Sequence, residues 1–279
     1  MSEQRSMSSF KGMEVGYGWD TGQMRRLNED SILSIAFDLR SYQGIVSAGL
    51  FAVADGMGGH NAGEIASDLA TRTFQAECIA GLLKQRTPAP LKVMEAAFKT
   101  ANETVASAAS EKSLQGMGTT LTAALIIGAD MYIAHIGDSR CYVINGRESI
   151  QVTRDHSLVQ QLIEAGLLTK DQARVHPRRN EITRVLGYAP GATPDLIHMK
   201  LYAGDNILLC SDGLHGVLDP DVMERTVIDA PDPSKACISL TEEANKAGGP
   251  DNISVIIIRP ENLPSWQAMI SAMTTVKAA

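Results

Sequence analysis

Residues 50–60 read Leu-Phe-Ala-Val-Ala-Asp-Gly-Met-Gly-Gly-His, and this stretch carries most of the information about the fold. The apolar run over residues 50–54 has the length of a buried strand, and it stops at Asp55. Three glycines follow within four residues, so the backbone there can approach a ligand closely or adopt positive φ angles. Residues 61–67 then read as a helix start. This order suits a metal or phosphate site, whereas an isolated Asp-Gly pair is equally an ordinary turn.

The length, charge and N-terminal sequence of the chain limit its functional class. With 279 residues, 44% of them hydrophobic, the chain can form one large domain or two small ones with ample core. Its net charge of −7 argues against nucleic-acid binding, which requires a basic surface. No apolar run reaches the roughly 18 residues of a membrane span, and residues 1–12 lack the apolar centre of a secretory signal. We therefore expect a flexible leader over residues 1–12.

The four cysteines have no CxxC spacing, which argues against a zinc site and against disulfides. They lie mostly in apolar runs, at Cys78, Cys141, Cys210 and Cys237. Buried free thiols are the expected state in a reducing compartment. We therefore expect a cytoplasmic protein, and we expect it to be a monomer.

The order of apolar segments predicts an α+β fold. Helical spacing occurs over residues 62–83 and 91–109, and again over residues 220–229 and 234–247. Short strand-like runs joined by tight turns make antiparallel pairs. These runs are residues 13–20, 31–37, 43–54, 119–127, 131–136, 140–144, 148–152, 195–201, 206–210 and 252–258. Because strands and helices come in blocks, the pattern favours antiparallel sheets with segregated helices.

Two further segments stand apart from this pattern. Residues 156–166 and 170–175 have helical but polar sequences, and we interpret the excursion over residues 156–186 as a surface flap. Residues 260–279 have the pattern of an amphipathic tail helix. The central domain would then span residues 13–259.

Four carboxylates lie at the ends of predicted buried strands. Asp55, Asp138 and Asp212 follow such strands, and Asp251 directly precedes one. Taken singly, each is equally typical of a turn or a helix cap. Together they predict convergence on one edge of a sheet, where like charges raise one another's pKa and a divalent cation removes that cost. Ligands that are all oxygen atoms favour Mg²⁺, Mn²⁺ or Ca²⁺.

A cluster of this kind with two metal ions would act on a phosphoryl group. Such a site requires a cation for the phosphate oxygens, and Arg25 and Arg26 stand just before Glu29 and Asp30. A solvated charged loop explains these four residues equally well. Other chemistries lack their motifs, because the chain has no G-x-S-x-G elbow, no P-loop and no HExxH sequence.

Eight motifs occur in the order found in one enzyme family. They are Arg25-Arg-Leu-Asn-Glu-Asp, Val53-Ala-Asp-Gly-Met-Gly-Gly-His, Gly118-Thr-Thr, Ile136-Gly-Asp-Ser-Arg, Thr153-Arg-Asp-His-Ser-Leu, His176-Pro-Arg-Arg-Asn, Cys210-Ser-Asp-Gly-Leu and Gly249-Pro-Asp-Asn-Ile-Ser. Each motif is weak alone, but eight in order over residues 13–258 are specific. The chain resembles the PPM-type metal-dependent serine/threonine protein phosphatases, the protein phosphatase type 2C family, of the bacterial kind.

The resemblance implies a four-layer α-β-β-α sandwich of two antiparallel sheets, with two Mn²⁺ or Mg²⁺ ions at one end and a weaker third ion. It also implies a role for each matching residue. Asp55 would bridge the two metal ions, and Asp212 and Asp251 would complete the ligands of the first ion. Glu29 and the Gly56 carbonyl would contact the second ion, with Asp30 in support. Asp138 would bind the third ion, and Arg25 would bind the substrate phosphate.

Two positions depart from the family pattern. Many eukaryotic members carry a general-acid histidine directly after the metal-site Asp-Gly, where this chain has Met57. His60 is our candidate for that role, and a helix-start residue is the alternative interpretation. The family often has another aspartate four residues after the Asp212 position, where this chain has Gly216. Binding of a third metal should therefore be weak or use other ligands.

The sequence thus predicts hydrolysis of phosphoserine and phosphothreonine in proteins by direct attack of a metal-bridging water. The expected partners are phosphoproteins, including substrates of a cognate serine/threonine kinase. In the flap, Arg178 and Arg179 are candidate contacts for the phosphopeptide, or equally solvated surface residues. One alternative is a catalytically weak regulatory module that binds phosphoproteins, which the complete ligand set disfavours. A metal-dependent phosphodiesterase or nuclease is the other, and the negative net charge disfavours it.

If His60 protonates the leaving group, His60→Ala should slow hydrolysis of an alkyl phosphate more than hydrolysis of an aryl phosphate. Only the poor alkyl leaving group needs the proton, and general-acid catalysis typically contributes about 10²-fold, so we expect the two losses to differ by at least about tenfold. Steady-state kcat/KM on both substrates measures this. Equal losses on both would exclude His60 as the acid.

Overall fold

Two antiparallel sheets make up the centre of the computed structural model, which describes residues 7–10, 12–41, 44–58, 62–84, 89–146, 148–188, 192–261, 263 and 265. The first sheet has the order β1 (Met7–Phe10), β2 (Met13–Asp20), β12 (Ile253–Pro260), β11 (Asn206–Cys210), β8 (Arg140–Ile144) and β9 (Ser149–Gln151). The second has the order β10 (Asp195–Lys200), β7 (Asp130–Ile136), β6 (Leu121–Ile127), β4 (Gly44–Met57) and β3 (Asp30–Ser41), and β5 (Gly118–Thr119) pairs with the end of β4.

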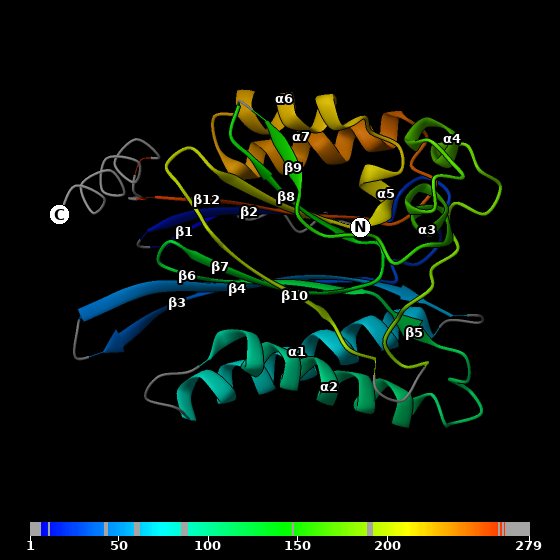
Figure 1. Cartoon of the computed structure of the whole chain (residues 1–279), viewed down its shortest axis with the longest axis horizontal. Coiled ribbons are helices and arrows are strands. Elements are labelled where there is room, and N and C mark those ends of the chain that lie inside the picture. Colours follow the sequence, from blue (N-terminus) through cyan, green and yellow to red (C-terminus); the bar gives the residue numbers. More distant parts are fainter. Residues whose placement is uncertain are drawn as a thin grey trace.

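Helices cover the outer face of each sheet (Figure 1). They are α1 (Gly63–Lys84) and α2 (Pro90–Ala108) on the second sheet, and α6 (Pro220–Asp229) and α7 (Pro233–Lys246) on the first. Apolar side chains fill three spaces, one between the sheets and one beneath each helix pair. The α+β class and the four-layer sandwich are both confirmed.

Strand β4 shows why the run over residues 50–54 is apolar at every position. Its side chains alternate between two cores, because successive residues of a strand point to opposite faces. Phe51 and Val53 lie between the sheets, whereas Leu50, Ala52 and Ala54 face α1 and α2. All five are fully buried. A strand with a core on both faces cannot alternate apolar and polar residues.

The end of β4 differs from the sequence-based expectation. The strand does not stop at Asp55 in an Asp-Gly turn but continues to Met57. Its backbone is kept extended on both sides, because Asp30 of β3 is the partner of Asp55 and Thr119 of β5 is the partner of Gly56. Asp55 therefore projects from a paired strand, which fixes its backbone more tightly than a turn would.

The two chain ends agree with the sequence only in part. Within the predicted leader, residues 7–10 form β1, which pairs with β2 because an edge strand offers unpaired backbone groups. The predicted tail helix falls almost entirely outside the described residues, and only residues 261, 263 and 265 of that segment are described beyond β12. Leu263 packs against the core between the sheets.

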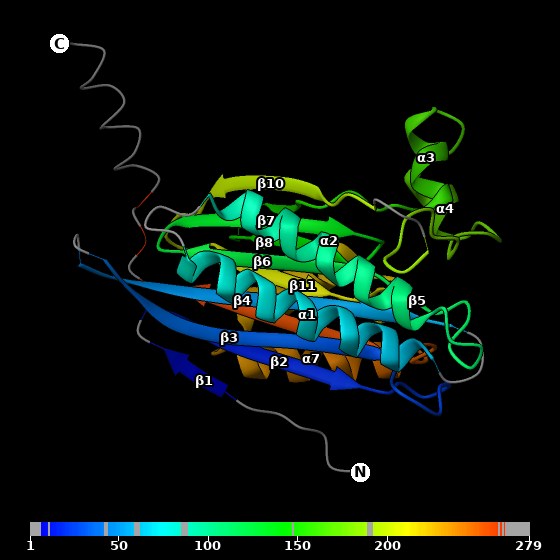
Figure 2. The ribbon, with the colours of Figure 1, turned by 90° about the horizontal axis from the view of Figure 1, so that it is seen from below.

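The segment predicted as a flap forms two short helices, α3 (Leu158–Glu164) and α4 (Lys170–Arg174). Figure 2 shows them projecting beyond the sandwich at one end, while α1 and α2 lie side by side across the second sheet. Arg174 of α4 forms an ion pair with Asp219, which precedes α6, at 2.6 Å. No helix within the described ranges is long and apolar enough to cross a membrane.

Candidate active site

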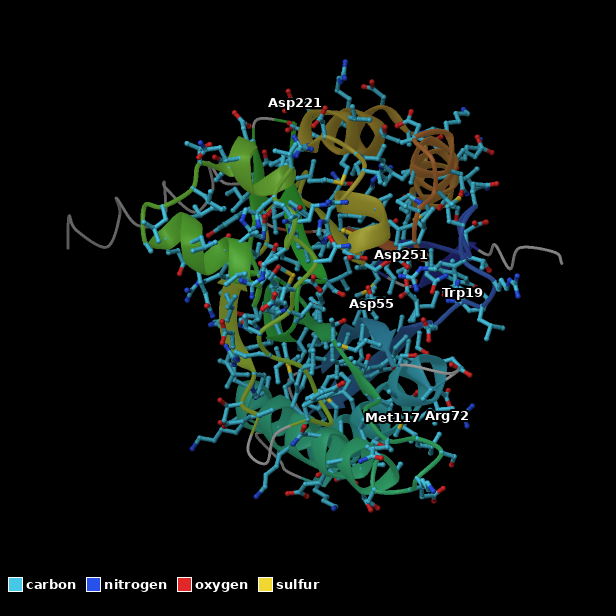
Figure 3. All side chains as sticks on the ribbon, turned by 90° about the vertical axis from the view of Figure 1, so that its right-hand side faces the viewer. Trp19, Asp55, Arg72, Met117, Asp221 and Asp251 are labelled. Atoms are coloured by element: carbon cyan, nitrogen blue, oxygen red, sulfur yellow. The ribbon has the colours of Figure 1, made fainter. Side chains whose placement is uncertain are left out.

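The predicted site carboxylates come from separate elements that end at the same edge of the sandwich. Asp30 begins β3, Asp55 lies near the end of β4, Asp138 lies in the turn between β7 and β8, Asp212 begins the short helix α5 (Asp212–His215), and Asp251 precedes β12. In Figure 3, which looks at this end of the molecule, the labelled Asp55 and Asp251 lie near each other between the two halves of the sandwich. The convergence that the sequence predicted is therefore present.

Electrostatics confirm that these carboxylates are close together. The pKa of Asp55 lies well above its ordinary value because of burial, and then because of Asp30, Asp212, Asp138 and Asp251. The surface of Asp55 is only partly covered, but protein surrounds its carboxylate on most sides. Burial also raises the pKa of Asp30 to about 7, the hydroxyl groups of Ser254 and Ser211 oppose that rise, and the negative charges of Asp212 and Asp251 add to it.

Several of the carboxylate oxygens are buried without a hydrogen-bond partner. They are both oxygens of Asp30 and one oxygen each of Asp138 and Asp212. Buried polar atoms are nearly always paired in proteins, so such a group of acceptors indicates a site for a cation. An all-oxygen donor set fits Mg²⁺ or Mn²⁺.

The carboxylates are nevertheless not closed around a single point. Among the described residues, no three His, Cys, Asp or Glu side chains are arranged to hold a metal ion. Both oxygens of Asp251 already have partners, since Oδ2 accepts from Arg25 at 2.7 Å and Oδ1 accepts from the backbone N–H of Asn252 at 2.9 Å. These two hydrogen bonds hold the Asp251 carboxylate in its observed orientation.

Two threonines hold the backbone of Asp55. The N–H of Asp55 donates to Thr120 Oγ1 at 2.9 Å, and its carbonyl accepts from Thr119 Oγ1 and from the N–H of Thr120, each at 2.9 Å. Thr120 Oγ1 also lies 2.9 Å from Ser139 Oγ, beside Asp138. The Gly118-Thr-Thr motif thus joins two of the acids, a role that the sequence did not reveal.

Glycine is required where Gly56, Gly63 and Glu29 meet. A Cβ on Gly56 would lie 2.1 Å from the carbonyl oxygen of Gly63 and 2.5 Å from that of Glu29. A Cβ on Gly63 would lie 2.5 Å from Glu29 Oε1. Burial raises the pKa of Glu29, and Arg25 and the backbone N–H of Gly63 oppose that rise. Glu29 and Gly56 are therefore neighbours, as their predicted shared metal requires.

Arg25 reaches across to the acids from the loop between β2 and β3. Its Nη2 lies 2.7 Å from Asp251 Oδ2, and its Nη1 lies 3.7 Å from Glu29 Oε2. The side chain remains 46% exposed, so part of the guanidinium faces solvent. A phosphate group that approached the carboxylates would meet this cation at the rim.

Two histidines hold the turn that carries Asp138. His156 Nδ1 accepts from the N–H of Gly137 at 3.0 Å, and the N–H of His156 donates to the carbonyl of Gly137 at 2.7 Å. His215 Nε2 lies 3.0 Å from the carbonyl of Asp138. Burial lowers the pKa of His215 to about 3, so the ring is neutral at physiological pH and donates through Nε2. Gly216 follows directly and offers no side-chain ligand.

Of three further sequence-based candidates, two are described, and these are not brought to the carboxylates. His60 lies outside the described residues. Arg178 pairs with Glu181 at 2.7 Å within the exposed flap. Within the described part of the chain, neither Arg178 nor Arg179 has a hydrogen bond or ion pair with the predicted metal ligands. Their contact with substrate stays a prediction.

The raised pKa values predict how chelator-treated protein responds to pH. A carboxyl with a raised folded-state pKa contributes stability that is fully present below its unfolded-state pKa of 3.8 and is lost as pH rises to the folded-state pKa, which is about 7 for Asp30 and is also raised for Asp55 and Asp138. The pKa values of His135 and His215 are lowered to about 4 and about 3, so these two residues raise stability as pH approaches their unfolded value of 6.5, and the wild type shares this contribution with the variant Asp55→Asn. The Tm of the wild type, taken relative to that of the variant Asp55→Asn, should therefore fall as pH rises from about 4 to about 7, by roughly 2–4 °C per pH unit for each proton involved.

Differential scanning calorimetry with and without Mn²⁺ tests this expectation. Mn²⁺ should remove most of the fall, since a cation stabilises the ionised carboxylates. The matched variant Asp55→Asn, which cannot ionise, should show a shallower fall without metal. A Tm of the chelated wild type that did not fall relative to that of Asp55→Asn between about pH 4 and pH 7 would contradict the assignment.

Comparison with known proteins gives close relatives in sequence. Residues 27–242 match the family model of protein phosphatase 2C. The serine/threonine protein phosphatase PstP of Mycobacterium tuberculosis is 39% identical over 247 residues, which are 85% of this chain and 43% of that protein. The serine/threonine phosphatase stp of Listeria monocytogenes is 36% identical over 250 residues, which are 88% of this chain and 95% of that protein.

Solved structures of related proteins have a similar fold. The crystal structure of the catalytic domain of PstP in complex with two manganese ions has a TM-score of 0.74 and 34% identity, covering 90% of this chain and 99% of that one. The chain therefore spans less than half of one curated relative and nearly all of another. A family match over residues 27–242 and relatives aligned along most of this sequence establish that the chain belongs to the protein phosphatase 2C family.

Proposed function

We propose that this chain is a metal-dependent protein phosphatase that hydrolyses phosphoserine and phosphothreonine. The observation that carries the proposal is the group of buried carboxylate oxygens without partners beside a half-exposed arginine. Relatives named as serine/threonine phosphatases support the substrate class, and the two manganese ions in one related structure support the metal requirement.

Each residue has a defined part in this scheme. Asp55, Asp212 and Asp251 would hold one divalent ion, and Asp55, Glu29 and the Gly56 carbonyl would hold the other, with Asp30 behind them. When bound, Mn²⁺ or Mg²⁺ supplies an acidified water and positive charge at the phosphate. Asp138 would serve a weaker third ion.

Arg25 acts on the substrate itself. Its guanidinium is planar and can bind two phosphate oxygens at once, so it would orient the phosphorus toward the carboxylate cluster. As charge develops on the phosphate in the transition state, the same donors stabilise it without further reorganisation. The proton for the leaving group would come from His60, a role that is assigned from the sequence alone.

We also propose partners, an oligomeric state and a location for the protein. Substrates would be phosphoproteins, including those of a cognate serine/threonine kinase, and the protein would act as a monomer. All four cysteines are free and buried, which supports a reducing compartment such as the cytoplasm. A non-catalytic phosphoprotein-binding role is the alternative, and the complete set of ligands argues against it.

The test is Mn²⁺-dependent phosphate release from a phosphoserine peptide, compared with hydrolysis of a phosphodiester. Asp55→Asn should reduce kcat/KM on the peptide to below about 1% of wild type, because loss of a bridging ligand exceeds the 10–100-fold cost typical of outer-shell changes. Circular dichroism should show an intact fold.

A surface carboxylate provides the control, since Asp221 of α6 lies away from Asp55 and Asp251 in Figure 3. Asp221→Asn should retain full activity. Retained activity in Asp55→Asn would refute the mechanism, and faster turnover of the diester than of the peptide would replace the phosphatase with a phosphodiesterase.

A further inference from the structure

Asn252 uses its whole side-chain amide to close the loop that carries Arg25. Its Nδ2 donates to the carbonyl oxygens of Thr21 and Leu27, each at 2.9 Å, and its Oδ1 accepts from the N–H of Glu29 at 2.8 Å. The side chain is 3% exposed. The two carbonyls lie on either side of Arg25, so one amide closes the loop at both ends.

The backbone of Asn252 is equally committed to the site. Its N–H donates to Asp251 Oδ1 at 2.9 Å, which leaves Oδ2 for Arg25. Its carbonyl accepts from Ser211 Oγ at 3.3 Å and lies 2.0 Å from the place where a Cβ on Gly213 would be. Asn252 thus contacts the Arg25 loop, the Asp251 carboxylate and the start of α5.

Only asparagine satisfies these three side-chain contacts. An aspartate of the same shape would still accept from Glu29 but would have no donor for Thr21 and Leu27. An alanine would remove the partner of two part-buried carbonyls and one N–H, which costs free energy wherever water does not replace the amide. The residue therefore does more than fill space beside the metal ligand that precedes it.

We propose that Asn252 is a positioning residue that sets Arg25 at the correct distance from the carboxylates to bind a phosphate monoester. The inference rests on the proposed function, because it concerns the phosphate that Arg25 would bind. Asn252 does not touch the substrate and acts through the loop over residues 21–29. Without the amide, the carbonyls of Thr21 and Leu27 lose their hydrogen-bond donor and the loop changes conformation. The guanidinium of Arg25 then moves relative to Asp251, and phosphate binding weakens.

The test compares Asn252→Ala with Asn252→Asp on a phosphoserine peptide with saturating Mn²⁺. Both variants should raise KM, and the inhibition constant of inorganic phosphate, by about tenfold, with a smaller change in kcat. A merely structural role would reduce the folded fraction and lower kcat while KM and phosphate inhibition stayed constant, and that result would overturn the proposal. If Asn252→Ala does not fold, Asn252→Asp, which keeps the shape and the contact with Glu29, decides the question.

The chain offers a matched control on the outer side of the same loop. Asn245 of α7 bonds Gln23 and Asp20 through its amide, at 3.0 and 3.1 Å, and has no hydrogen bond to Asp251, Arg25 or Glu29 among the described residues. Asn245→Ala should leave both constants within about twofold of wild type, because its side-chain bonds reach Asp20 and Gln23, and the Asn252 contacts with Thr21, Leu27 and Glu29 stay in place. Equal effects of the two alanine variants would mean that any loosened loop suffices, which would contradict a specific role for Asn252.

A double-mutant cycle asks whether Asn252 acts through Arg25. In an Arg25→Ala background, Asn252→Ala should add less than about a twofold rise in KM, since the group it positions has gone. A further tenfold rise would show an independent action and overturn the proposal.

The outcomes also separate this inference from the proposed function. A wild-type protein that released no phosphate from phosphopeptides would refute the function. The role of Asn252 would then be decided by calorimetric titration of the Mn²⁺-loaded wild type and Asn252→Asp with inorganic phosphate. Weaker phosphate binding by the variant would support that role, and equal affinity or no binding by either would refute it.

Discussion

Mutual repulsion among buried carboxylates is the constraint on which this end of the molecule depends. Asp30, Asp55 and Asp138 have strongly raised pKa values, and several of their oxygens have no hydrogen-bond partner. A flexible chain would move such groups apart, because like charges in a poorly solvated place cost several kcal/mol. The sandwich prevents this by attaching each acid to an element packed against one of three apolar cores. The free energy gained by burying apolar side chains in the three cores therefore compensates for the unfavourable repulsion among the carboxylates.

The same arrangement shows what could be predicted from sequence. The run Leu50–Ala54 predicted a buried strand because its composition suits a core on both faces, and the acids at strand ends predicted a cluster at one edge. These inferences depend on local patterns that the fold does not override. The end of β4 was predicted wrongly because an Asp-Gly pair usually signals a turn, whereas here Thr119 extends the pairing to Gly56. Helix α5 was not predicted, since the four residues Asp212–His215 include a glycine and are too few for a periodic pattern.

The supporting contacts could not have been derived from local sequence at all. Asn252 bonds Thr21 and Leu27 across separations of 231 and 225 residues, and Thr120 bonds Asp55 across 65. Both lie in motifs that match the family, so the sequence indicated that these positions matter without indicating what they contact. A hydrogen bond between distant residues is set by how strands pack, which composition and periodicity do not encode. The gathering of the acids at one edge was therefore predictable from the sequence, whereas the groups that orient them required the structure.

Arg25 links the repulsion among the buried carboxylates with the proposed binding of a phosphate group. The acids need a counter-charge, and the guanidinium supplies one by contacting Asp251 closely and Glu29 at longer range. A guanidinium has five N–H donors in a fixed plane, and these contacts use only part of them. Its side chain is also 46% exposed, so the remaining donors are accessible at the rim of the carboxylate cluster. The cation that reduces repulsion inside the site is therefore the group best placed to receive a phosphate from outside. Because Asp251 and Glu29 fix the direction of Arg25, repulsion among the acids would also determine where a phosphate group binds.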